Sequence, residues 1–246
     1  MIMSNKDNKD TDKKLKVRKK RKFKKRYWLL IDLALAIVIL YLLFYKPAHY
    51  RPLDINPAGN NQDQVSPYLS NVLLPQLHNG AQRQEPFDLV VIEKGINEAI
   101  ARLQWPQESN GVLLSAPTVF FVPDNIVLMG TASIKGAELV VTVVAKPSLD
   151  EEGLLNLRVE KVKIGAMNIT LLARVMAKKM YTDRLATVPV DTENLRARIA
   201  ASLLVDEPFV PVFNVRDIFD DVDKKVRLEK ITITQKKLTL RLVPVS

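Results

Sequence analysis

The stretch that decides the fold is residues 153–165, which read GLLNLRVEKVKIG. Leu155, Leu157 and Val159 alternate with polar residues, which predicts a strand with one face buried and the other exposed to water. The alternation changes phase at Glu160–Lys161, because the next apolar residues occupy even-numbered positions. We expect a β-bulge there, which adds one residue to the strand and bends the sheet.

More strands are predicted on both sides of this stretch, because apolar, β-branched runs alternate with turn residues. The upstream runs are 87–92, 112–122, 126–134 and 139–146. Downstream, apolar and polar residues alternate over 238–242, and a second phase shift falls between Leu228 and Ile231. Long strands with such shifts indicate a curved, mostly antiparallel sheet.

A long helix is predicted over residues 169–185, directly after the bulged strand. Its apolar stripe consists of Leu171, Leu172, Val175, Met176 and Met180, and its opposite face is basic. Shorter helices are expected over 93–103 and 193–204. The predicted fold class is therefore α+β: an N-terminal transmembrane helix, then a curved antiparallel β-sheet packed around one long helix.

The N-terminal part carries the features of a membrane anchor. Residues 27–45 read YWLLIDLALAIVILYLLFY, an apolar run interrupted only by Asp32. At about 1.5 Å per residue this run is roughly 28 Å long, close to the thickness of a bilayer core. It is longer than the apolar core of a cleaved signal peptide, so we expect a retained signal anchor. Asp32 either pairs with a partner helix or, the favoured alternative, reaches Lys24 or Lys25 near the membrane edge.

The charge distribution predicts the orientation. Residues 1–26 carry 13 basic and three acidic side chains, whereas the rest of the chain has no net charge. By the positive-inside rule the N-terminus is cytoplasmic, and the large C-terminal part lies outside the cytoplasm at the inner or plasma membrane. The basic tail is expected to meet anionic lipid headgroups there. Because the remainder is neutral, no specific nucleic-acid partner is expected.

Composition divides the rest of the chain in two. Prolines recur throughout residues 46–86, which predicts a stiff stalk, and the apolar patch 68–77 within it is a candidate helix that docks on the domain. Residues 87–246 form the predicted extracytoplasmic domain, and these 160 residues suffice for one hydrophobic core.

Patterns typical of catalysis and metal binding are missing from the sequence. It has no cysteine, no glycine-rich phosphate loop and no nucleophile elbow, and its two histidines, His49 and His78, lie far apart in the stalk. The acidic pairs Glu151/Glu152 and Asp220/Asp221 fall in predicted polar turns. We therefore expect a protein without catalytic residues, metal or cofactor.

A binding surface is the remaining candidate for a site. The expected lipid groove lies between the sheet and the long helix and is lined by Leu155, Leu157, Leu171, Leu172, Val175 and Met176. The expected headgroup rim is basic and consists of Arg174, Lys178, Lys179 and Arg184. The alternative is that the apolar stripe is ordinary core and that the basic face is simply solvated.

The anchor is followed by LVVIEKGINEAI (89–100), PDNIVLMG (123–130) and EGLLNLRVEKVKIGAM (152–167). This order of features resembles the YpmS-like family of bacterial single-pass envelope proteins, and the similarity covers roughly residues 87–185. The resemblance implies a location in the envelope and a domain shape, since the family has no settled activity.

Two functions are compatible with this sequence. The first is a non-enzymatic, membrane-anchored envelope protein whose outer domain binds a lipid or another amphiphile. The second is a bitopic scaffold for an envelope protein complex, with Asp32, the stalk and an exposed strand edge near Lys237–Val243 as contacts. An open apolar groove favours the first, and a closed core with an exposed patch favours the second.

Overall fold

The computed structural model describes residues 26–48, 50, 66–83, 85–109, 111–187, 195–215 and 224–245. The predicted basic tail up to residue 25 and the stalk segment 51–65 lie outside these residues. The chain divides into two compact units, with the boundary between Leu43 and Phe44. The first unit contains a helix, Arg26–Leu43, which is long and apolar enough to cross a membrane. The predicted span is 27–45, so this helix begins one residue earlier than predicted and ends two residues earlier than predicted.

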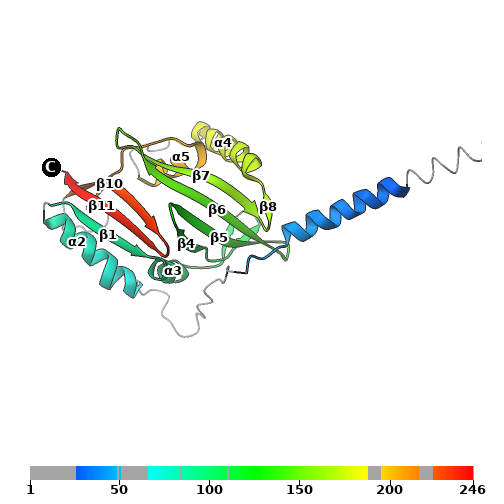
Figure 1. Cartoon of the computed structure of the whole chain (residues 1–246), viewed down its shortest axis with the longest axis horizontal. Coiled ribbons are helices and arrows are strands. Elements are labelled where there is room, and N and C mark those ends of the chain that lie inside the picture. Colours follow the sequence, from blue (N-terminus) through cyan, green and yellow to red (C-terminus); the bar gives the residue numbers. More distant parts are fainter. Residues whose placement is uncertain are drawn as a thin grey trace, which may run out of the picture. The chain divides into compact units, whose positions relative to one another are not determined.

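The larger sheet of the second unit has seven antiparallel strands (Figure 1). They are β2 (Gln107–Ser109), β3 (Val112–Leu114), β4 (Thr118–Val122), β5 (Asn125–Ile134), β6 (Ala137–Leu149), β7 (Leu155–Ile164) and β8 (Met167–Asn168). Their order is β2-β3-β5-β6-β7-β8, and β4 pairs with β5 beside β3. The run predicted as one strand over 112–122 is thus two strands, separated around Pro117, which has no backbone N–H to donate.

The smaller sheet has four strands, in the order β1-β11-β10-β9. They are β1 (Phe87–Ile92), β9 (Val212–Asn214), β10 (Lys225–Thr234) and β11 (Lys237–Val245). β11 pairs with β1 along one side and with β10 along the other. The prediction of an exposed strand edge near Lys237–Val243 is therefore wrong. This segment is an interior strand that pairs with a neighbour along both edges.

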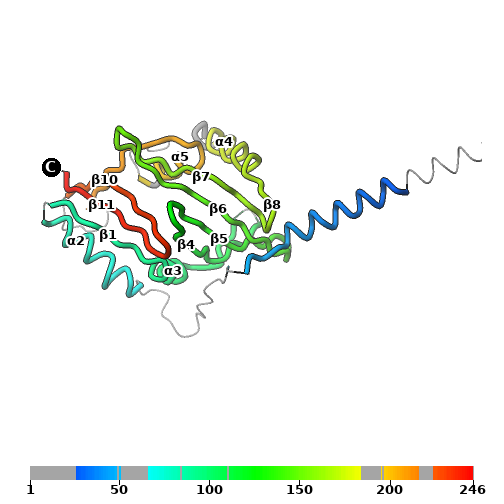
Figure 2. The backbone as a smooth tube through the Cα atoms, in the orientation of Figure 1, coloured from blue at the N-terminus to red at the C-terminus, as the bar shows by residue number. Residues whose placement is uncertain are grey.

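Both predicted phase shifts are confirmed as irregularities of strand register. In the β6–β7 pair, Val144 faces Lys161 while Ala145 faces Val159, so Glu160 is the extra residue. In the β10–β11 pair, the register shifts between Leu228 and Lys230, which leaves Glu229 as the extra residue. Figure 2 traces the backbone of the long paired strands β6, β7, β10 and β11.

The helices of the second unit lie at the margins of the sheets. They are η1 (Leu69–Leu73), α2 (Leu74–Gln82), α3 (Glu93–Ala101), α4 (Thr170–Thr187) and α5 (Leu195–Val205). Leu77 and Ala81 of α2 are buried in the core, so the apolar patch of the predicted stalk is a helix that docks on the domain. Residues 66–82 therefore belong to the folded unit.

The core lies between the sheets and the N-terminal helices. One buried cluster joins α2 to β1, β10 and the start of β7 through Leu77, Leu89, Leu155 and Leu228. A second cluster joins β1, β4 and β10 through Val91, Phe121 and Ile233. Neither cluster includes any of the α4 side chains that the structure describes, residues 170–183. The prediction of a sheet curved around this long helix is accordingly not confirmed, although the α+β class and the antiparallel sheets are.

Candidate functional site

Helix α4 turns its apolar residues to solvent. These residues, called here the apolar face, and their exposed fractions are Leu171 80%, Leu172 58%, Val175 69%, Met176 54% and Met180 67%. The partly buried side of the helix consists of Thr170, Ala173, Ala177 and Tyr181. Burying a Leu, Val or Met side chain is favourable by about 1.5–3 kcal/mol. Five such side chains in water on one helix form a surface that a binding partner can cover.

Helix α4 packs on the edge of β7 that faces away from β6, next to the short strand β8. The hydroxyl Oγ1 of Thr170 accepts a hydrogen bond from the backbone N–H of Val162 at 2.9 Å. One turn later, Nη2 of Arg174 donates to the carbonyl oxygen of Val159 at 2.9 Å. β8 pairs with β7 only at Lys163 and Ile164, and beyond it these side chains supply the bonds of a neighbouring strand. The helix presents its small residues to the sheet and its large apolar residues to solvent.

Helix α5 covers the preceding part of the same edge. The hydroxyl of Ser202, which is fully buried, accepts a hydrogen bond from the N–H of Leu157 at 2.8 Å. Two residues before Leu157 in β7, Leu155 and Phe209 form two reciprocal backbone hydrogen bonds, at 2.8 and 3.0 Å. Helices α4 and α5 thus lie along β7 one after the other, as Figure 1 shows.

A cavity of about 170 Å³ lies where α4, α5 and β7 meet. It is lined by Val159, Arg174, Lys178, Leu203, Leu204, Val205 and Asp206. Pockets for drug-sized ligands usually measure about 300–1,000 Å³. This cavity therefore has room for a small polar group but not for an acyl chain. Its two cations suit a phosphate, and the carboxylate of Asp206 suits the cationic part of a zwitterionic phosphate ester.

A larger and more polar depression of about 460 Å³ lies on the smaller sheet. It is lined by Asp88, Glu229, Lys230, Thr232, Thr239 and Arg241. Arg241 and Asp88 form an exposed ion pair there at 3.2 Å. The lining holds no histidine, cysteine or serine, and in the described part of the chain no group of His, Cys, Asp and Glu is arranged to hold a metal ion.

The structure separates the side chains that the sequence combines into one groove. Leu155 is a core residue with 5% exposure, and Leu157 packs against the same core cluster. The other four predicted groove residues, Leu171, Leu172, Val175 and Met176, are exposed on α4.

The predicted headgroup rim is brought together only in part. Arg174 and Lys178 line the cavity, and Lys179 is exposed on α4 without lining it. The side chain of Arg184 lies outside the described residues. The end of α5 and the residue after it, Leu203–Asp206, are the part of the site that the sequence did not indicate. The predicted helix over 193–204 gives its position in the chain but not its proximity to α4.

Comparison of the chain with protein-family models, with curated proteins and with solved structures found no match in any of the three.

Proposed function

We propose that the protein is a single-pass membrane protein whose domain binds a lipid or another amphiphile without catalysis. The observation that carries this proposal is the exposed apolar face of α4 beside the cavity lined by Arg174 and Lys178. Acyl chains match the apolar face, and a phosphate headgroup matches the two cations. The helix Arg26–Leu43 is the proposed anchor.

The proposed orientation follows from charge. The basic residues before the anchor place the N-terminus in the cytoplasm, and the domain then lies on the outer side of the inner or plasma membrane. A bacterial envelope location follows from the resemblance to the YpmS-like family and is part of the same proposal.

Arg174 is suited to hold both the sheet edge and a headgroup. A guanidinium has five N–H donors, and one of them is used by the carbonyl oxygen of Val159. The side chain is exposed, so its other donors are accessible from the cavity. Lys178, one helical turn further on, adds a second cation on the same side of α4.

Photocrosslinking tests this proposal with the full-length chain. The chain is purified in detergent, incubated with a phosphatidylglycerol that carries a photoreactive acyl chain, and mapped by mass spectrometry. We expect crosslinks on residues 171–180 of α4, and fewer crosslinks there in the double variant Arg174→Gln/Lys178→Gln. Lys161→Gln, which removes an exposed cation of β7, is the matched control and leaves the yield unchanged. Crosslinks confined to residues 26–43 contradict lipid binding by the domain.

The scaffold function shares one supporting observation, the same apolar face, because a partner helix can also cover it. The strand-edge contact that the scaffold function was expected to use is not available, since β11 is an interior strand. A protein partner predicts protein–protein crosslinks from α4 in native membranes and no lipid adduct on that helix.

A further inference from the structure

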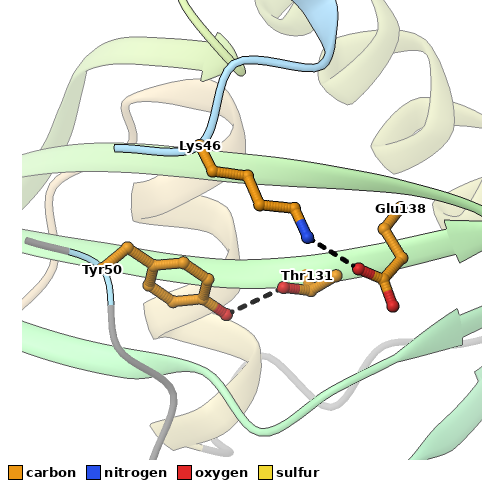
Figure 3. A network of polar contacts seen from close by, with 4 residues as sticks. All are labelled: Lys46, Tyr50, Thr131 and Glu138. Atoms are coloured by element: carbon orange, nitrogen blue, oxygen red, sulfur yellow. Dashed lines mark hydrogen bonds and ion pairs between the residues drawn. The ribbon is translucent and has the colours of Figure 1, made fainter. Parts of the chain in front are cut away.

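The chain is clasped to the larger sheet directly after the apolar helix. Nζ of Lys46 lies 2.9 Å from Oε2 of Glu138 in β6, and the hydroxyl of Tyr50 lies 3.0 Å from Oγ1 of Thr131 in β5 (Figure 3). Lys46 follows Leu43 by three positions, so that at most about 10 Å of extended chain connects them. Glu138 and Thr131 therefore hold the first residues that follow the apolar helix along the chain.

Helix α4 begins at the end of the sheet that carries Glu138. The hairpin of β5 and β6 turns at residues 135–136, two positions before Glu138. In the next pair, Val141 faces Ile164, and the N–H of Gly165 donates to the carbonyl oxygen of Val140 at 2.7 Å. The first turn of α4 follows five residues later. The turn at 150–153, by contrast, lies at the other end of β6, about 40 Å away along a 13-residue strand.

The described side chains of α4 include two kinds that hold helices in a membrane interface, exposed apolar residues and cations. Leucine, valine and methionine form its apolar face. Arg174 and Lys178 are exposed beside this face, and Lys179 and the single acidic residue, Asp183, lie within it at helical spacing. Such helices lie parallel to the membrane, with apolar side chains about 5–10 Å below the headgroups and cations near anionic lipids.

We infer that α4 docks on the surface of the membrane that anchors the protein, with the apolar face among the acyl chains and the three cations among anionic headgroups. This inference rests on the anchor of the proposed function. It also assigns the source of the lipid: a headgroup enters the cavity beside Arg174 directly from the bilayer.

Site-specific fluorescence tests the inference, because the chain has no cysteine and one introduced cysteine is a unique labelling site. The full-length variants Met176→Cys, Glu151→Cys and Leu40→Cys are labelled with an environment-sensitive dye. They are placed in nanodiscs of equal parts phosphatidylcholine and phosphatidylglycerol that contain lipids with a nitroxide high on the acyl chain. We expect quenching of the dye at positions 176 and 40 and none at position 151.

Charge provides the second measurement. Removing one cation near an anionic surface weakens binding about fivefold, so that Lys179→Gln in the Met176→Cys chain lowers the ratio of docked to free helix by about that factor. Lys161→Gln is the matched control and leaves the ratio unchanged. In nanodiscs of phosphatidylcholine alone all three cations lose their anionic partners, so the ratio of docked to free helix falls further than in Lys179→Gln.

Each other outcome overturns the inference in a recognisable way. Quenching at position 40 without quenching at 176 leaves the anchor intact and excludes docking of α4. Equal quenching at 176 and 151 indicates unspecific adsorption of the domain. If the emission of the dye at position 176 shifts to the blue without quenching, a protein surface covers the helix, for example that of a second copy of the chain. Absence of quenching at position 40 means that the anchor itself fails.

Discussion

Asn97 and Val119 form a reciprocal pair of buried hydrogen bonds. Oδ1 of Asn97 accepts from the N–H of Val119 at 2.6 Å, and its Nδ2 donates to the carbonyl oxygen of Val119 at 2.7 Å. One turn earlier in α3, Oε2 of Glu93 accepts from the N–H of Phe121 at 2.9 Å. Four helical residues rise about 6 Å and two strand residues about 6.6 Å. The distance between Glu93 and Asn97 along α3 therefore matches the distance between Phe121 and Val119 along β4. The two helix side chains take the place of a neighbouring strand at this edge of β4.

This pair predicts a large effect for one small substitution. Asn97→Ala leaves a buried N–H and a buried carbonyl oxygen without partners, and each unpaired group costs about 1–3 kcal/mol. We expect a loss of about 3 kcal/mol in the free energy of unfolding, measured by urea denaturation of the full-length chain. Asn71→Ala, at an exposed position of η1, is the control and changes this energy by at most about 0.5 kcal/mol. Equal effects of the two variants would show that α3 does not complete the edge of β4.

A second prediction concerns Ser202 in α5. Ser202→Ala removes the acceptor of the Leu157 N–H in a fully buried place. We expect a destabilisation of about 1–3 kcal/mol and faster hydrogen exchange of the amide of Leu157 than of amides in the β5–β6 pair. Ser202→Thr keeps the hydroxyl, and its Leu157 amide is expected to exchange more slowly than that of the alanine variant. Unchanged exchange in Ser202→Ala would contradict the role of α5 at this edge.

A third prediction concerns the close approach of Tyr68 to α3. A Cβ atom at Gly95 would overlap the ring of Tyr68, whereas a Cβ at Gly130 would have only ordinary contacts, 3.8 Å from Pro117. Gly95→Ala is therefore expected to destabilise the fold by about 1–3 kcal/mol and to disturb the packing of η1. Gly130→Ala is the matched control in a strand and is expected to be neutral or stabilising. Thermal unfolding of both variants distinguishes these outcomes.

A fourth prediction concerns pH and the clasp. The hydrogen bond and the charge of Lys46 hold the pKa of the Glu138 carboxyl below its ordinary value. Because the folded-state pKa is the lower one, the stabilising effect is complete above the ordinary pKa and is lost as the pH falls through the lowered pKa. We expect Lys46→Gln to raise the pKa of Glu138, as measured by carbon NMR of labelled glutamate. Since both side chains are exposed, the effect on stability is small. An unchanged pKa in the variant would show that the clasp does not form in solution.

Local patterns predict part of this fold well. Both bulges, the docked helix of the stalk segment and the apolar N-terminal helix follow from periodicity and composition, which depend only on neighbouring residues. The division into two sheets does not follow in this way. It depends on the pairing of β1 with β11, which lie about 150 residues apart, and no local signal specifies such a partner.

The orientation of α4 shows why the candidate site could be predicted only in part. An apolar stripe at helical spacing usually faces a core, so the sequence places Leu171, Leu172, Val175 and Met176 against the sheet. The helix instead sits on the edge of β7, where Thr170 and Arg174 supply polar bonds and small residues such as Ala173 allow close approach. Arg174 and Lys178 line the same cavity, and their spacing of one helical turn is a local property that the sequence shows; their role as a headgroup rim stays a prediction.

The interior position of β11 imposes an order on folding during synthesis. The ribosome releases the chain from the N-terminus, so β1 emerges long before the strand that lies beside it in the smaller sheet. Until residues 237–245 appear, one edge of β1 and one edge of β10 have no partner, and Leu89, Leu228 and Leu242 cannot close the core between them. The smaller sheet therefore closes only after residues 237–245 have left the ribosome, so the strands made before them wait for this last partner.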